Sequence, residues 1–114
     1  GYRIEVGGKS IWYLTDTEHF EDGIDQNIVG LIGGADIVIY DATYTDEEYP
    51  RFKGFGHSTW QQGIRVAEEA GVETLVIFHH EPGHDDKWMD KVAKMAEKAR
   101  PGTVVAQEGM ALRP

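Results

Sequence analysis

Four residues in this sequence carry the side chains that metal sites and acid–base chemistry use. Asp16, Asp41 and His79 each follow a short run of apolar residues, and His57 lies between the last two. Carboxylates and imidazoles are ligands for borderline and hard divalent cations, and an Asp–His pair can move protons near neutral pH. The chain contains no cysteine, so a metal would have to be held by these groups.

Each of these residues also has a commonplace structural explanation. An aspartate after a strand often closes a turn, and a buried histidine often bonds a backbone carbonyl. His79 is followed directly by His80, and successive side chains of a strand point to opposite faces, so at most one of the pair can reach a shared edge. The roles of His80 and His84 remain open. Each of the four residues alone is weak evidence for a functional site. Their occurrence together, in order along the chain, favours one.

Five strands are expected to position these residues: Tyr2–Val6, Ser10–Thr15, Ala35–Asp41, Thr74–Phe78 and Thr103–Ala106. The first two form a hairpin around Gly7–Gly8. The third and fourth are apolar without alternation, which is typical of strands buried on both faces.

Three helices are expected between the strands. The first covers Asp25–Ile32, with Leu31 on its apolar side. The second begins at the Ser58–Gln61 capping box and ends at Gly71, and the third is capped by Asp85–Asp86 and stops before Pro101. The order β-β-α-β-α-β-α-β predicts an α/β fold with a mixed sheet that is parallel in its later part. Ligands of such sheets collect at the carboxyl ends of the strands. Asp16, Asp41 and His79 are therefore expected at one edge.

Length and charge limit the possible functions. At 114 residues, with 40% hydrophobic and 27% charged residues, residues 1–114 are expected to form a single globular domain. The net charge of −9 disfavours non-specific binding to nucleic acid or anionic membranes. A phosphate-bearing substrate remains possible because a bound dication reverses the local field. No apolar run approaches ~18 residues, and a cytoplasmic protein is expected.

The motifs resemble those of metallo-β-lactamase-fold hydrolases. Leu14–Thr17 is similar to their Gly-Asp-Thr motif, with threonine in place of the glycine, and Leu75–His79 resembles the strand that delivers their last histidine ligand. Tyr40–Tyr44 and Gly56–Thr59 resemble two segments of RNase Z, an endonuclease that processes tRNA 3′ ends. The segment Phe78–Asp86 is closer to cyclic phosphodiesterase branches of the same family.

This resemblance implies the C-terminal half of a four-layer αββα sandwich, with helices on one face of the sheet. In that family the counterpart of Asp16 bridges two metal ions and the counterpart of His79 binds one of them. The cofactor implied is a divalent metal, zinc first, with manganese or iron as alternatives. His57, oriented by Asp41, would act catalytically near the scissile phosphate. The family's H-x-H-x-D-H ligand signature does not occur in this sequence, so the chain alone is expected to bind metal weakly and to hydrolyse little.

The expected substrate is a small or cyclic phosphodiester rather than tRNA, because the chain is acidic and shows no basic patch. A half-sandwich would expose an apolar sheet face, which predicts a homo-oligomer such as a symmetric dimer. The alternative from another class is a non-catalytic α/β domain that binds a small anion or a protein, or that only self-associates. The sequence contains no glycine-rich phosphate loop that would support anion binding. A degenerate, non-catalytic relative of the hydrolases is a third possibility.

Overall fold

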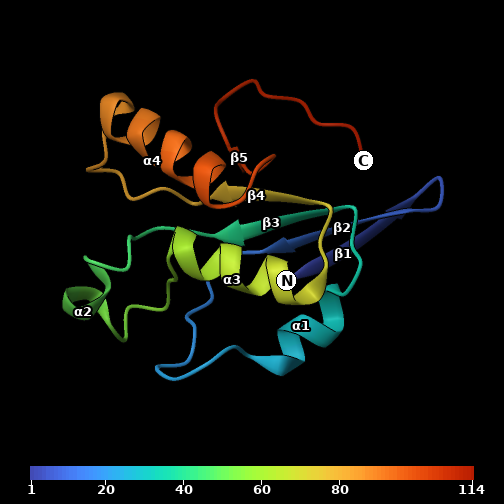
Figure 1. The fold of residues 1–114 in the computed structure, drawn as a ribbon, viewed down its shortest axis with the longest axis horizontal. Helices are drawn as coiled ribbons and strands as arrows, with labels where there is room; N and C mark the ends of the chain where they lie inside the picture. Colours follow the sequence, from blue (N-terminus) through green and yellow to red (C-terminus); the bar gives the residue numbers. More distant parts are fainter.

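The strands lie in the sheet in the order in which they occur along the chain (Figure 1). The computed structural model describes residues 1–114. Its strands are β1 (Tyr2–Val6), β2 (Lys9–Leu14), β3 (Ile37–Asp41), β4 (Thr74–Phe78) and β5 (Val104–Val105). β1 and β2 are antiparallel, whereas β2 to β5 are parallel to one another. The expected mixed sheet is confirmed.

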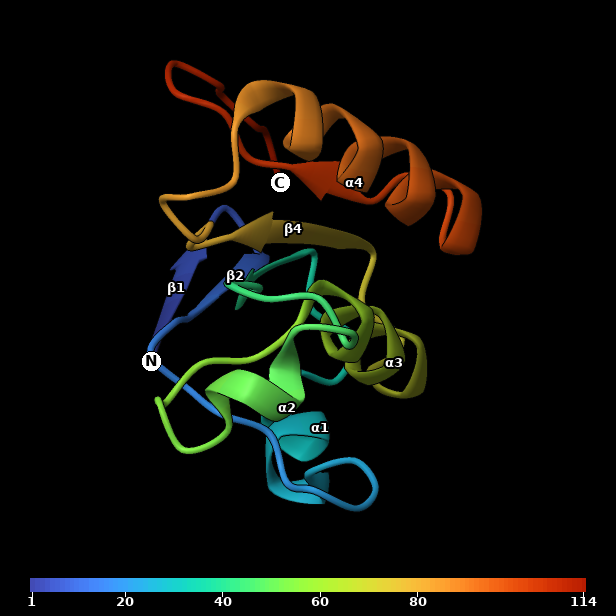
Figure 2. The same ribbon diagram turned by 90° about the vertical axis from the view of Figure 1, so that its left-hand side faces the viewer.

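The helices are α1 (Gln26–Ile32), α2 (Tyr49–Phe52), α3 (Trp60–Ala70) and α4 (Asp86–Ala99). Figure 2 shows α1, α3 and α4 on one side of the sheet. α3 lies over the centre and buries Ile64, Val66 and Ala67 among the core residues, and the sheet side chains Val38, Tyr40, Leu75 and Ile77 belong to the same core. The core therefore lies between the sheet and its single helical layer.

The structure corrects four details of the expected elements. The loop between β3 and α3 contains the additional short helix α2, which the polar and aromatic sequence there did not predict. The cap of α3 is Thr59, whose side chain accepts a hydrogen bond from the Gln62 amide, rather than Ser58. β5 is shorter than expected, and Leu31 of α1 is exposed.

The face of the sheet opposite the helices is apolar. It forms a groove of ≈ 360 Å³ against the C-terminal segment. The sheet contributes Ile11, Tyr13, Ile37, Ile39, Val76 and Phe78, and the C-terminal segment contributes Met110 and Leu112. Strands β3 and β4 thus present apolar side chains to both faces, as expected. None of the helices is long and apolar enough to cross a membrane.

Candidate metal centre

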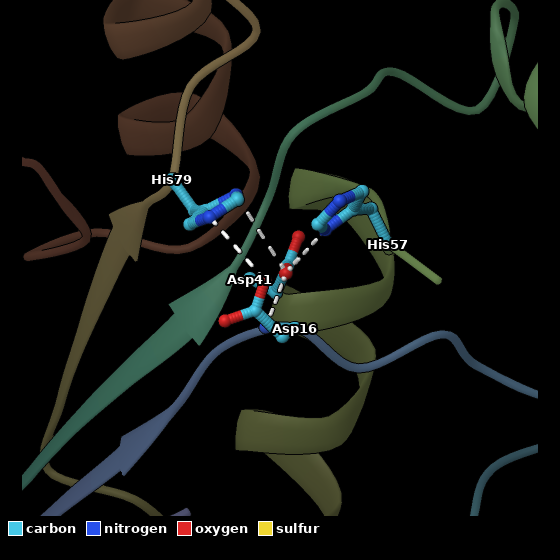
Figure 3. Close-up of side chains that lie close together, drawn as sticks. All are labelled: Asp16, Asp41, His57 and His79. Atoms are coloured by element: carbon cyan, nitrogen blue, oxygen red, sulfur yellow. Dashed lines mark hydrogen bonds and ion pairs between the residues drawn. The ribbon is translucent and has the colours of Figure 1, made fainter. Parts of the chain in front are cut away.

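The four candidate residues meet at the carboxyl edge of the sheet. Asp16 follows β2, Asp41 ends β3, His79 follows β4, and His57 precedes α3 (Figure 3). One ligand atom from each of the four lies within 4.8 Å of the others. The parallel pairing of β2, β3 and β4 brings these residues together although they are far apart in sequence. Each strand end projects one polar group to the same edge.

Asp16 and His79 share an unusual backbone conformation. They are the two non-glycine residues with positive φ, at 55° and 65° respectively. This left-handed conformation costs ordinary residues about 1–2 kcal/mol and is found disproportionately at functional sites. Here it turns the chain sharply at the end of each strand. The result is that His79 Nε2 lies 3.6 Å from Asp16 Oδ1, with the Asp16 side chain 75% exposed.

Asp41 is the buried anchor of the site. Its side chain is 0% exposed, and both carboxylate oxygens accept hydrogen bonds. Oδ2 accepts from the Asp16 amide at 2.8 Å and lies 2.9 Å from His57 Nδ1. Oδ1 accepts from the Thr43 hydroxyl at 2.9 Å and from the amides of Thr43 and Ser58 at 3.3 Å. Both oxygens of this buried carboxylate are thus occupied by hydrogen bonds within the chain.

Thr43 fixes the orientation of His79. Its Oγ1 lies 3.0 Å from His79 Nδ1 and also contacts the His79 carbonyl at 2.7 Å. A hydrogen bond from Nδ1 to this hydroxyl leaves Nε2 as the ring nitrogen available to a metal, the arrangement usual for metal-binding histidines. Thr43 lies inside the Tyr40–Tyr44 segment, and the sequence alone assigned it no role. The signal that could have identified it is its position two residues after the strand-end Asp41, where a hydroxyl can bond back to the carboxylate.

His57 lies against His79. The two rings stack with centroids 4.8 Å apart and an interplanar angle of 25°. Because His57 Nδ1 faces the Asp41 carboxylate, a proton on Nδ1 leaves Nε2 free to exchange one with another molecule. The ring is 22% exposed. The candidate acid–base residue is thus adjacent to the candidate metal ligand.

Two further histidines support the loops around the site, and sequence reasoning missed both roles. His19 Nδ1 lies 2.8 Å from Ser58 Oγ, which also lies 3.2 Å from the Tyr40 hydroxyl. Burial lowers the pKa of His19 below its usual 6.5 and raises the pKa of Tyr40 to about 12. Both groups are therefore held neutral near pH 7. They fix the segment that carries His57.

The second support is a hydrogen bond between His84 and Glu48. Nε2 of the largely buried His84 ring lies 2.7 Å from Glu48 Oε1, and the ring stacks on Trp88 at 4.8 Å. Burial tends to raise the pKa of Glu48, but hydrogen bonds from His84 and the Thr45 amide outweigh it and lower that pKa below 4.5. His80 lies elsewhere, with Nε2 3.0 Å from the Ala106 carbonyl. His84 and His80 are thus outside the four-residue cluster.

The donor set fits a divalent metal at this edge. Asp16 offers an exposed carboxylate and His79 an oriented imidazole nitrogen, and these are the oxygen and nitrogen ligands that zinc, manganese or iron accept. Asp41 and His57 are committed to each other. Two protein ligands are fewer than the three that catalytic zinc sites use. Asp16 and His79 would therefore supply only part of a metal site.

The fold is that of the metallo-β-lactamase class. Residues 1–80 match the family described as the beta-lactamase superfamily domain. The chain belongs to this superfamily, and the predicted resemblance is confirmed.

Relatives of this chain include proteins named ribonuclease Z. The chain is 34% identical over 110 residues to ribonuclease Z of Parabacteroides distasonis. The aligned region covers 96% of the chain and 34% of the relative. It is 30% identical over 105 residues to ribonuclease Z of Brevibacillus brevis, covering 89% and 31%. The chain thus spans about a third of the length of the relatives that it matches.

Two solved structures share the fold. The metallo-beta-lactamase fold protein YhfI from Bacillus subtilis aligns with a TM-score of 0.72 and 21% identity, covering 95% of this chain and 41% of that one. Human tRNase Z, short form, aligns with a TM-score of 0.62 and 23% identity, covering 90% and 32%. At these identities the likeness establishes the fold alone.

Proposed function

We propose that this chain contributes the C-terminal half of a two-metal phosphodiesterase site, in which Asp16 and His79 are metal ligands. The observation that carries the proposal is the convergence of the Asp16 carboxylate and His79 Nε2 beside the paired Asp41 and His57. Ribonuclease Z relatives support phosphodiester hydrolysis as the reaction. The remaining ligands would come from a half that carries the H-x-H-x-D-H signature.

The roles of the four residues follow from their contacts. Asp41 holds the Asp16 backbone through its amide and holds the His57 ring through Nδ1, so it positions a ligand and an acid–base group at once. His57 Nε2 would give a proton to the leaving oxygen or stabilise charge on the phosphate. Divalent metal ions bound here would supply an activated water and polarise the phosphate. Zinc is the first candidate because its ligands are nitrogen and carboxylate oxygen.

For the substrate we propose a small or cyclic phosphodiester. The net charge of −9 supports it, as does the resemblance of the segment from Phe78 to Asp86 to the cyclic phosphodiesterase branches of the family. A second candidate is the 3′ region of an RNA, which the name of the ribonuclease Z relatives favours. Both are phosphodiesters and need the same chemistry. They differ in how much basic surface the complete protein must offer.

We also propose that the apolar sheet face is covered in solution by a second sheet. In the complete sandwich this would be the other half of the domain, and in the isolated chain a second copy, giving a homodimer. The apolar lining of the groove beside Tyr13 and Phe78 supports this, since removing apolar surface from water favours association. Light scattering at rising protein concentration would show dimers. A monomer at every concentration would contradict the dimer.

The function is tested by metal content and hydrolysis measured together. The chain is assayed on bis(p-nitrophenyl) phosphate and on a precursor tRNA, alone and mixed with a polypeptide that carries the H-x-H-x-D-H half. The proposal expects metal-dependent diester hydrolysis in the mixture and little by the chain alone, with Asp16→Asn and His79→Ala inactive. Cleavage of precursor tRNA with poor cleavage of the small diester would select the RNA substrate. No hydrolysis of either would contradict the proposal.

A further inference from the structure

A row of aromatic rings leads from the candidate site to the protein surface. The His57 ring meets the Tyr44 ring edge-on with centroids 6.2 Å apart. Tyr44 stacks face to face on Phe52 at 4.5 Å and 6°, and Phe52 meets Phe55 edge-on at 6.0 Å. The first ring after His57 is buried, with Tyr44 only 7% exposed, whereas the last, Phe55, is 67% exposed. The row therefore ends in a ring face open to solvent.

The loop that carries Phe55 is held in a defined shape. The Phe55 amide donates to the Phe52 carbonyl at 3.1 Å, with Lys53 at φ −57°, ψ 131° and Gly54 at φ +90°. These angles define a type II turn, which requires a residue such as glycine at its third position. The Gly54 amide also donates to Glu18 Oε1 at 2.6 Å. The exposed ring is thus presented by an anchored turn.

One cation lies directly on the aromatic row. The Arg51 guanidinium lies over the Phe52 ring at 5.6 Å, whereas Lys53 is paired with the exposed Glu21 at 2.6 Å and the Glu18 carboxylate accepts from the Gly54 amide. Phe55 is also only two residues before His57. The Phe55 ring packs edge-on against Phe52 and leaves 67% of the residue's surface exposed.

We propose that Phe55 is a stacking platform for a nucleobase of the phosphodiester that occupies the neighbouring site. A planar base extends the row of rings outward, and stacking of a base on an aromatic side chain tolerates any base because every base has a π face. The base belongs to a cyclic nucleotide or to the end of a single-stranded RNA, which share this chemistry. The inference rests on the proposed function only in placing the phosphodiester beside the platform.

The test measures the binding of base-bearing and base-free diesters to the chain by NMR titration. The probes are adenosine 2′,3′-cyclic monophosphate, a short oligoadenylate and dimethyl phosphate, which has no base. The expected result is saturation transfer to the adenine protons and shifts of the Phe55 and Gly56 amides. The base-bearing probes should bind about 5- to 100-fold more tightly than dimethyl phosphate. Tighter binding of the cyclic nucleotide than of the oligoadenylate, or the reverse, identifies the source of the base.

Matched variants separate stacking from other effects. Phe55→Ala should remove the preference for a base, whereas Phe55→Trp should keep it because the larger ring still stacks. Phe20→Ala is the control, since Phe20 is 58% exposed but lies outside the row of rings, and it should leave binding unchanged. Amide spectra that overlay those of the wild type verify folding of each variant.

Two results would overturn the proposal: equal binding of adenine-bearing probes by wild type and Phe55→Ala, or no contact with the adenine protons in the wild type at millimolar ligand. Failure of the proposed function has a different signature. In that case neither Asp16→Asn nor His79→Ala changes metal binding or hydrolysis, while the stacking on Phe55 is still observed.

Discussion

Replacing Asp41 by asparagine exchanges one carboxylate oxygen for an NH₂ group, which donates hydrogen bonds, while keeping the shape of the side chain. In either orientation the new amide group faces donors: the Asp16 amide and the His57 ring on one side, or the Thr43 hydroxyl and the Ser58 amide on the other. His57 can respond by moving its proton to Nε2, but a backbone N–H cannot change its role. At least one buried backbone donor therefore loses its acceptor.

The size of the effect follows from the burial of Asp41, whose side chain is 0% exposed. An unsatisfied buried donor costs about 1–3 kcal/mol, and a lost hydrogen bond to a charged group about 1.5–3 kcal/mol. We expect Asp41→Asn to lower the free energy of unfolding by about 2–5 kcal/mol, and to lower the melting temperature by roughly 4 °C for each kcal/mol.

Urea unfolding followed by circular dichroism measures this change. The control is Glu21→Gln, which removes an ion pair whose carboxylate is 72% exposed and should leave the urea midpoint nearly unchanged. Metal affinity should fall with the stability, because Asp41 also holds the Asp16 backbone in place. An Asp41→Asn protein as stable as the Glu21→Gln control, with unchanged metal affinity, would refute this account of the site.

Three further predictions follow from individual contacts. Asp16→Gly should abolish metal binding yet keep or raise stability by up to about 1 kcal/mol, because glycine adopts φ 55° without strain; calorimetry and a zinc titration measure both, and a destabilised variant would contradict the strain. Gly63→Ala should destabilise by about 1–3 kcal/mol, since its Cβ would lie 2.9 Å from Tyr40 Cδ1; unchanged urea unfolding would contradict the close packing. The pKa of Glu48 is lowered from 4.5 in the folded protein, so its stabilising contribution is present above pH 4.5 and is lost as pH falls through the folded pKa. The free energy of unfolding between pH 3 and 6 should therefore depend less on pH in Glu48→Gln than in the wild type. The same pH dependence in both proteins would contradict the contact with His84.

The strands and their ends were predictable because a strand buried on both faces requires a continuous run of apolar residues. The apolar runs before Asp41 and His79 have no polar alternation, so both the strand type and the polar strand end can be identified. Register and sheet order then bring the strand ends together. The edge of the sheet that holds the candidate site is a direct consequence of strand pairing.

The parts that sequence reasoning missed depend on contacts between distant loops. Ser58 and Thr59 are both favourable cap residues by type. The Ser58 hydroxyl is occupied by contacts with His19 and Tyr40, which leaves Thr59 to cap the helix. The hydrogen bond of His84 with Glu48 joins residues 36 positions apart. No local pattern reports such a pair, because its geometry exists only once β3, β4 and α4 are packed.

The most direct test of the central claim is a zinc titration of the chain followed by the histidine ring nitrogen signals in NMR. If Asp16 and His79 are part of a metal site, zinc should perturb His79 Nε2 before the rings of His80 and His84. Asp16→Asn should weaken binding by tenfold or more, a loss of about 1.4 kcal/mol, whereas His80→Ala should not. Zinc that binds with equal affinity to the Asp16→Asn protein, or that leaves the His79 signal unmoved, would contradict the claim.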